Sequence, residues 1–178
     1  GVPLMEHVTK TVIGSAQEAL EFGRELQLLL RYLDISDADM EKGQFRLEAN
    51  VSIAPALRQA QGESAGLGTK VELKNINSFR AIKNALIYEV ERQKELLGMG
   101  EKVVQETRGW DESEGITVSQ RGKEEAHDYR YLPEPDLPPM ELTSSEGINL
   151  EELRLSLPEL PEAKRKRFKK EFGLRGDQ

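Results

Sequence analysis

The sequence predicts an α+β protein: an antiparallel sheet that forms a cradle, helices packed on its apolar face, and then the start of a small all-α domain. Apolar and polar residues alternate over residues 44–53, which is typical of a strand with one face on a core. Residues 68–91 combine a second alternating segment with an amphipathic helix, and helical spacing returns from residue 148. We therefore expect a first domain over residues 1–140 and a helical domain that begins at 141–178.

The composition limits the class of protein. The 178 residues carry a net charge of −7 and include no cysteine, which excludes disulfides and thiolate metal sites. The negative charge argues against a general nucleic-acid binder but permits a local basic patch. No apolar run is long enough to cross a bilayer, and no signal peptide is visible. We expect no membrane association and a location in the cytoplasm, or in an organelle matrix if the source is eukaryotic.

The first segments contain one candidate site pair and one clear helix. Glu6 and His7 lie in a short extended segment, where a carboxylate and an imidazole suit a metal or proton-transfer site. Adjacent strand residues point to opposite faces, so surface placement of both remains the alternative. Ser15 and Glu18 form a capping box that predicts a helix over 15–33. The acidic residues of 34–43 lack the spacing of a calcium loop and indicate a solvated turn.

Two predicted strands carry unusual polar faces. Arg46, Glu48 and Asn50 share the polar side of the strand over 44–53. After a glycine-containing connection over 54–69, Lys70 and Glu72 begin the polar side of the next strand, which Lys74 continues. If the two strands are neighbours, these side chains form one candidate site. An ordinary solvated face is the alternative.

The second strand runs into a helix that we expect over 78–97. Asn77 or Ser78 can cap this helix, whose apolar residues follow at helical spacing. Asn75, the lysines and the carboxylate meet at the helix N-terminus, a suitable place for a phosphate or a developing anion. The plain structural interpretation, a cap beside a solvated strand face, stays open.

The rest of the chain predicts a hairpin and a basic helix. Residues 102–111 and 116–121 form the expected hairpin. Tyr129 and Arg130 follow in a charged, aromatic segment that can contact an RNA end, although such tyrosines are often half-buried in a core. The helix over 163–172 contains Lys164 and Arg165, and contact with an RNA backbone or plain solvation explains it equally well.

Five motifs occur in order along the chain: GVPL-x-E, RLEANVSI, GTKVELKNINSFR, QETRGWDE and KEEAHDYRYLPEPDLPP. Together they resemble the GatB/GatE family, the B subunits of tRNA-dependent amidotransferases. The resemblance spans essentially the whole chain. It implies that residues 1–140 are the C-terminal part of a catalytic cradle domain whose first part lies outside this chain, and that an isolated fragment is inactive.

The resemblance also implies a reaction. An amidase subunit (GatA), assembled with a small linker subunit (GatC), releases ammonia from glutamine. The B subunit uses ATP and Mg²⁺ to phosphorylate the side-chain carboxylate of misacylated Glu-tRNA(Gln) or Asp-tRNA(Asn). Ammonia then displaces phosphate and forms the amide. The alternative is a non-catalytic fragment that binds tRNA or acts as a scaffold.

Matching the motifs residue by residue implies roles for individual side chains. Glu48 stands where the family usually has aspartate, which keeps the charge on a longer arm. The implied groups are Glu6 and Glu48 for the metal, Lys70, Arg46 and Asn50 for the nucleotide, Glu72, Lys74 and Asn75 for catalysis, and Tyr129 and Arg130 for tRNA. Lys164 and Arg165 are further candidates for tRNA contact because of the basic helix that contains them.

Overall fold

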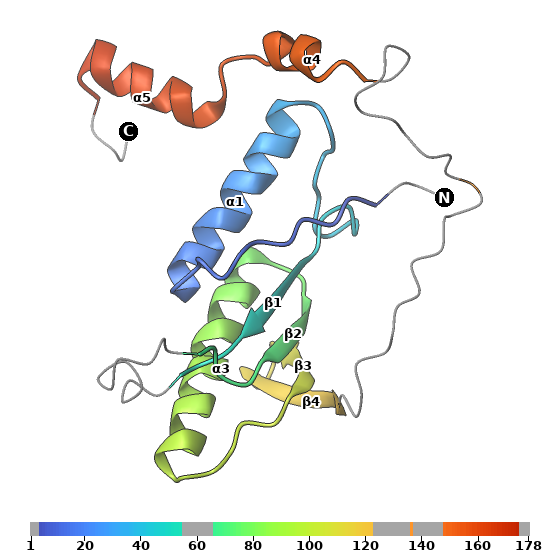
Figure 1. The fold of residues 1–178 in the computed structure, drawn as a ribbon, viewed down its shortest axis with the longest axis vertical. Helices are drawn as coiled ribbons and strands as arrows, with labels where there is room; N and C mark the ends of the chain where they lie inside the picture. The colour runs from blue at the N-terminus through green and yellow to red at the C-terminus, as the bar shows by residue number, and fades with distance from the viewer. Residues whose placement is uncertain (1–3, 55–65, 123–135, 137–147, 175–178) are drawn as a thin grey trace. The chain divides into compact units, whose positions relative to one another are not determined.

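The computed structural model describes residues 4–54, 66–122, 136 and 148–174, and Figure 1 shows their fold. The strands and the helices that flank them confirm the predicted α+β class. The elements are α1 (Ala16–Tyr32), β1 (Leu47–Val51), β2 (Val71–Ile76), α3 (Phe79–Gly98), β3 (Glu106–Asp111), β4 (Ile116–Gly122), α4 (Leu150–Ser156) and α5 (Pro161–Phe172).

The four strands form one sheet in the order β1-β2-β3-β4. β1 pairs with β2, and β3 with β4, in antiparallel fashion, as predicted. The prediction of a wholly antiparallel sheet is wrong, because β2 and β3 are parallel. The 20-residue helix α3 provides the reason: it returns the chain along the sheet, so that β3 starts at the same end as β2.

The hydrophobic core lies between α3 and one face of the sheet. Val71 and Leu73 of β2 are fully buried against Ile82 and Ala85 of α3. α3 begins where the sequence predicts, because the Ser78 side chain accepts a hydrogen bond from the Ala81 amide at 3.0 Å. The core therefore occupies the helix side of β1 and β2 and leaves their other face to polar side chains.

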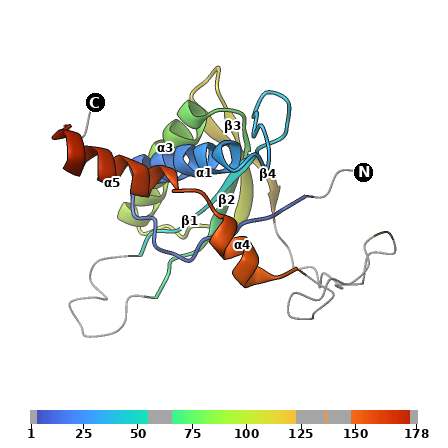
Figure 2. The same cartoon turned by 90° about the horizontal axis from the view of Figure 1, so that it is seen from above.

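α1 also packs on this core (Figure 2). Its capping residues behave as predicted: Ser15 Oγ accepts from the Glu18 amide at 3.1 Å, and Glu18 accepts from the Gly14 amide at 2.7 Å. A Cβ at Gly23 would lie 3.1 Å from side chains of Leu47 and Phe79, so the glycine permits a close approach of the helix. The first turns of α1 are thereby held near the start of β1 and of α3.

The C-terminal segment, considered by itself, contains the short helix α4 and the basic helix α5. Asn149 caps α4 by accepting from two backbone amides, at 3.1 and 3.2 Å. Gly173 ends α5 with a φ of 62°, which favours glycine. The helical periodicity is confirmed here, whereas the division at residue 140 stays a prediction. No described helix has both the length and the apolar composition that crossing a membrane requires.

Candidate functional site

The candidate site lies on the face of β1 and β2 that points away from α3. Asn50 is paired with Glu72 across the two antiparallel strands, one residue from the buried pair Val51 and Val71. Because strand residues alternate between faces, Glu48 and Asn50 share their face with Glu72 and Lys74. The two predicted polar faces are therefore neighbours, as the sequence indicated.

A lysine between two carboxylates forms the centre of this face. Lys74 Nζ lies 3.7 Å from Glu48 Oε2 and 3.7 Å from Glu72 Oε1. Both distances describe ion pairs rather than short hydrogen bonds, so the three ammonium donors of Lys74 are not tightly committed. The Glu48 side chain is 50% exposed and that of Glu72 only 18%. The cluster thus joins an open carboxylate, a sheltered carboxylate and a cation.

Thr107 on β3 holds the sheltered carboxylate in place. Its hydroxyl donates to Glu72 Oε2 at 2.8 Å, and the two residues are paired across the parallel strands. Thr107 is only 7% exposed, and the pairing of β3 with β4 shifts register immediately after it. The extra residue of this bulge is Gln120 on β4, so Thr107 and Arg108 keep the regular alternation of β3. Thr107 was not among the predicted site residues, although its place in the QETRGWDE motif was a signal.

The other predicted nucleotide and catalytic residues border this cluster. Arg46 and Lys70 are exposed and directly precede β1 and β2. Asn75 lies near the end of β2 with a φ of 59°, a left-handed conformation that asparagine tolerates better than most residues. The structure therefore places these residues along the same two strands as the cluster, with Asn75 closest to α3.

The predicted metal ligands are only partly brought together. Glu6 is exposed in the extended N-terminal segment, and its neighbour His7 stacks on Phe22 with ring centroids 6.1 Å apart. Within the described ranges, no three His, Cys, Asp or Glu side chains gather in a way that could hold a metal. Glu48 and Glu72 remain a two-carboxylate set, and Mg²⁺ commonly binds one or two carboxylates with water and phosphate oxygens.

The predicted tRNA contacts divide into two groups. Tyr129 and Arg130 lie outside the described residues. Lys164 on α5 is half-buried, with its ammonium 5.8 Å from the centre of the Tyr32 ring and 6.0 Å from that of Phe168. Its charge is therefore already engaged with aromatic faces, while Arg165 is exposed. Binding of tRNA by these residues stays a prediction.

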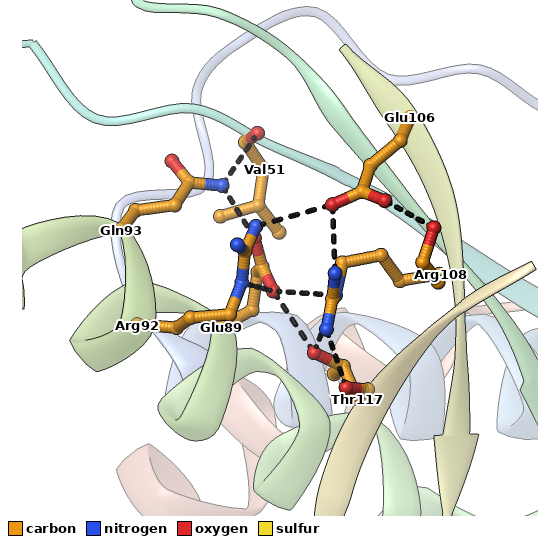
Figure 3. A network of polar contacts seen from close by, with 8 residues as sticks. Val51, Glu89, Arg92, Gln93, Glu106, Arg108 and Thr117 are labelled. Carbon is orange, nitrogen blue, oxygen red and sulfur yellow. Dashed lines mark hydrogen bonds and ion pairs between the residues drawn. The ribbon is translucent and has the colours of Figure 1, made fainter. Parts of the chain in front are cut away.

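A buried charge cluster occupies the opposite face of β3 and β4 (Figure 3). Glu89 of α3 is fully buried and accepts from Arg92 at 2.7 and 2.9 Å. It also accepts from Gln93 at 2.8 Å and from the Thr117 hydroxyl at 3.1 Å. Arg108 of β3 lies 3.6 Å from the same carboxylate. The hydrogen bonds that Arg92 donates to Glu89 raise the pKa of Arg92, so this guanidinium stays charged.

Glu106 completes the cluster. It accepts from Arg108 at 2.7 Å and lies 3.7 Å from Arg92. Burial tends to raise the pKa of Glu106, but hydrogen bonds from Ser119 and Arg108 outweigh burial and lower it. Two carboxylates therefore balance two guanidiniums between α3 and the β3–β4 hairpin. Because consecutive strand residues face opposite ways, anchoring Arg108 on this face also sets the position of Thr107 on the other.

The sequence did not predict this cluster either. The signal was available, because Glu89 and Gln93 continue the helical spacing of the apolar residues Ile82 and Leu86. Polar residues on a buried stripe need partners. Their partners lie on β3 and β4, however, and the parallel placement of β3 was not predicted.

Comparison with known proteins defines the family. Residues 1–147 match the model of the GatB/GatE catalytic domain. The chain therefore belongs to the GatB/GatE family, as its motifs predicted.

Among curated proteins, the chain is similar to subunits B of aspartyl/glutamyl-tRNA(Asn/Gln) amidotransferases. It is 51% identical over 174 residues to the subunit of Roseiflexus sp., a match that covers 98% of this chain and 34% of the relative. The subunits of Herpetosiphon aurantiacus and Carboxydothermus hydrogenoformans are 51% and 49% identical over the same shares of both chains. The chain thus spans about a third of the length of the curated relatives it matches.

Proposed function

We propose that this chain forms part of the catalytic domain of an amidotransferase B subunit. That subunit would use ATP and Mg²⁺ to phosphorylate the side-chain carboxylate of Glu-tRNA(Gln) or Asp-tRNA(Asn) and would then amidate it with ammonia. The observation that carries the proposal is the cluster of Glu48, Lys74 and Glu72 on the open face of the sheet, in a chain that matches the family's catalytic domain. An amidase subunit, a small linker subunit and the misacylated tRNA are the proposed partners, in the cytoplasm.

The chemistry explains why cations and carboxylates are needed together. A carboxylate oxygen of the aminoacyl group attacks the γ-phosphorus of ATP, and the bond to ADP breaks. Ammonia then attacks the acyl carbon, the bond to phosphate breaks, and the nitrogen loses a proton. Lys70 and Lys74 would bind the phosphate oxygens as negative charge moves among them. Glu72, whose Oε2 accepts a hydrogen bond from the Thr107 hydroxyl, would accept the proton from nitrogen.

The two carboxylates fit a magnesium ion in type and number. Glu48 and Glu72 would supply the oxygen ligands, and both carboxylates already pair with one cation, Lys74 Nζ. When bound there with ATP, Mg²⁺ would neutralise phosphate charge. Glu6 is a further proposed ligand, while Arg46 and Asn50 would line the nucleotide side of the same face and Asn75 its far end.

The test uses the full-length protein assembled with its partner subunits. Ammonium chloride replaces glutamine, so that only the chemistry of the B subunit is measured as ATP-dependent formation of Gln-tRNA(Gln). Lys74→Ala and Glu72→Gln should each lower the rate by about 100-fold or more, with tRNA binding unchanged. Lys94→Ala is the matched control, because Lys94 is exposed on α3 and pairs only with Glu91 in the described structure. Wild-type rates in both site variants would refute the proposal.

A scaffold without chemistry is the second candidate. The exposed basic residues of α5 favour it, because they resemble a surface for an RNA backbone. Wild-type protein that binds tRNA but never converts it, even with saturating ammonia and ATP, would support this candidate. The same result would refute the proposal of phosphorylation.

A further inference from the structure

A pocket of about 410 Å³ opens at the ends of the parallel strands β2 and β3, beside the first turn of α3. Its lining includes Asn75 and Asn77 from the β2–α3 junction, Gly109 and Trp110 from β3, and Gln120 from β4. The volume falls in the range of small-molecule sites. Gly109 is paired with Lys74 across the sheet, so the pocket adjoins the cluster of Glu48, Lys74 and Glu72.

Three primary amides of this pocket have unused hydrogen-bonding groups. In the part of the chain that the structure describes, the side chains of Asn75, Asn77 and Gln120 form no hydrogen bond and no ion pair with another residue. Each amide offers one acceptor oxygen and two donor hydrogens. Three amides from two separate segments, all lining one pocket, are suited to a ligand that presents donors and acceptors along an edge.

Gly109 allows two of these amides to come together. A Cβ on Gly109 would lie 2.2 Å from Nε2 of Gln120 and 3.1 Å from Nδ2 of Asn75. Any larger residue would therefore push the amides apart or force Gln120 away. The glycine thus lets the Gln120 amide lie across β3 next to Asn75.

The charges around the pocket indicate which part of a ligand would enter. Asp111 and Glu112 line it, and none of the described lysines or arginines does. The Asp111 carboxylate is engaged in its turn, where it accepts from the Ser113 hydroxyl and amide, and these bonds lower its pKa. A phosphate would be repelled here, whereas a neutral, planar group would not. Lys74 offers a cation just outside, on the strand that leads into the pocket.

We propose that this pocket binds an adenine base through its amide side chains. Asparagine and glutamine pair bidentately with the donor and acceptor of the adenine edge, and Trp110 also lines the pocket. The inference rests on the proposed function for its ligand, because both ATP and the 3′-terminal adenosine of tRNA carry adenine. Asn75, which the sequence assigned to catalysis, then recognises the base instead.

Equilibrium dialysis of the full-length protein in its complex tests this inference. The probes are adenosine, guanosine, ATP, inorganic tripolyphosphate, and tRNA with or without its terminal adenosine. Gln120→Met removes one amide at an exposed strand position, and Asn75→Gly removes another while tolerating the positive φ. Gln105→Met is the matched control, because Gln105 is exposed and does not line the pocket. Each site variant should weaken adenosine binding about tenfold, and the control should not.

Comparing these probes shows whether the adenine comes from ATP or from the terminal adenosine of tRNA. Weaker ATP binding in Gln120→Met, with tripolyphosphate unchanged, assigns the pocket to ATP. Weaker binding of the complete tRNA alone, with the truncated tRNA unchanged, assigns it to the terminal adenosine. Affinities for adenosine, ATP and complete tRNA that equal wild type in both site variants would overturn the inference, as would tighter binding of guanosine than of adenosine.

The same probes distinguish failure of the inference from failure of the proposed function. Lys74→Ala should weaken the binding of ATP and of tripolyphosphate while leaving the affinity for adenosine unchanged. If Lys74→Ala has this effect and the amide variants have none, the pocket inference fails and the phosphate site stands. If wild type binds no ATP, the proposed phosphorylation fails, and the adenosine and tRNA arms still decide the pocket.

Discussion

Replacing Glu89 by glutamine tests the buried charge cluster most severely. The change preserves the size of the side chain but removes its charge and turns one acceptor oxygen into a donor. Four donor groups from Arg92, Gln93 and Thr117 converge on the wild-type carboxylate at 2.7–3.1 Å. An amide at this place would direct its own hydrogens at these donors and leave two guanidiniums facing a single carboxylate.

The expected loss in the free energy of unfolding follows from the burial of these charged side chains. The side chains of Arg92 and Arg108 are 19% and 13% exposed, and Glu89 is 0% exposed. Removing one partner of a buried ion pair typically costs about 3–5 kcal/mol. Glu106 stays within 3.7 Å of Arg92 and 2.7 Å of Arg108 and offsets part of the loss. We therefore expect the lower end, a fall of about 3 kcal/mol in the free energy of unfolding.

Guanidinium unfolding, followed by the fluorescence of Trp110, measures this change. Trp110 is the sole tryptophan of the sequence and lies on β3 in edge contact with Tyr88 of α3. With an m-value of about 4 kcal/mol/M, the midpoint should fall by about 0.75 M. Glu91→Gln is the control, because its ion pair with Lys94 is exposed and should contribute about 0.5 kcal/mol or less. If Glu89→Gln loses no more free energy of unfolding than this control, the reasoning is refuted.

Three further changes have defined outcomes. Because its neighbours lower the pKa of Glu106 below the ordinary 4.5, Glu106 stabilises the fold above about pH 4.5 and loses this effect as pH falls through the folded pKa. Glu106→Gln should therefore flatten the decline of stability with acid in a pH series of unfolding curves, and an unchanged slope would contradict this. Ser78→Ala should cost about 1 kcal/mol in the same assay through loss of the α3 cap, and no loss would count against that cap. Gly23→Leu should cost about 1–3 kcal/mol through overcrowding between α1, Leu47 and Phe79, whereas a neutral result would show that α1 can move away.

Local patterns in the sequence were enough for much of the fold. The alternation of β1, the capping residues of α1 and α3, and the turn between β3 and β4 depend on neighbours close in the chain, and all are confirmed. The direction of β3 depends on how α3 crosses the sheet, which no local pattern records. Because the parallel direction of β3 was not predicted, the roles of Thr107 and of the partners of Glu89 were not predicted either.

The candidate site was predictable to the same extent. Pairing of β1 with β2 follows from their order and places Glu48 beside Lys74 and Glu72. The pocket behind Lys74 was not predictable, because it requires Gly109 and Gln120 from strands whose register is a long-range property. The predictions for Glu6 and for the tRNA-contacting residues remain predictions.

One measurement tests the proposed phosphorylation most directly. The complete complex is incubated with Glu-tRNA(Gln) and ATP labelled in the γ-phosphate, without glutamine or ammonia, and hydroxylamine is added to trap an activated carboxylate. We predict ADP formation that depends on Glu-tRNA(Gln), a trapped hydroxamate in equal amount, and loss of both in Lys74→Ala. ATP cleavage that ignores the misacylated tRNA, or amide formation from ammonia without any ATP cleavage, would contradict the account.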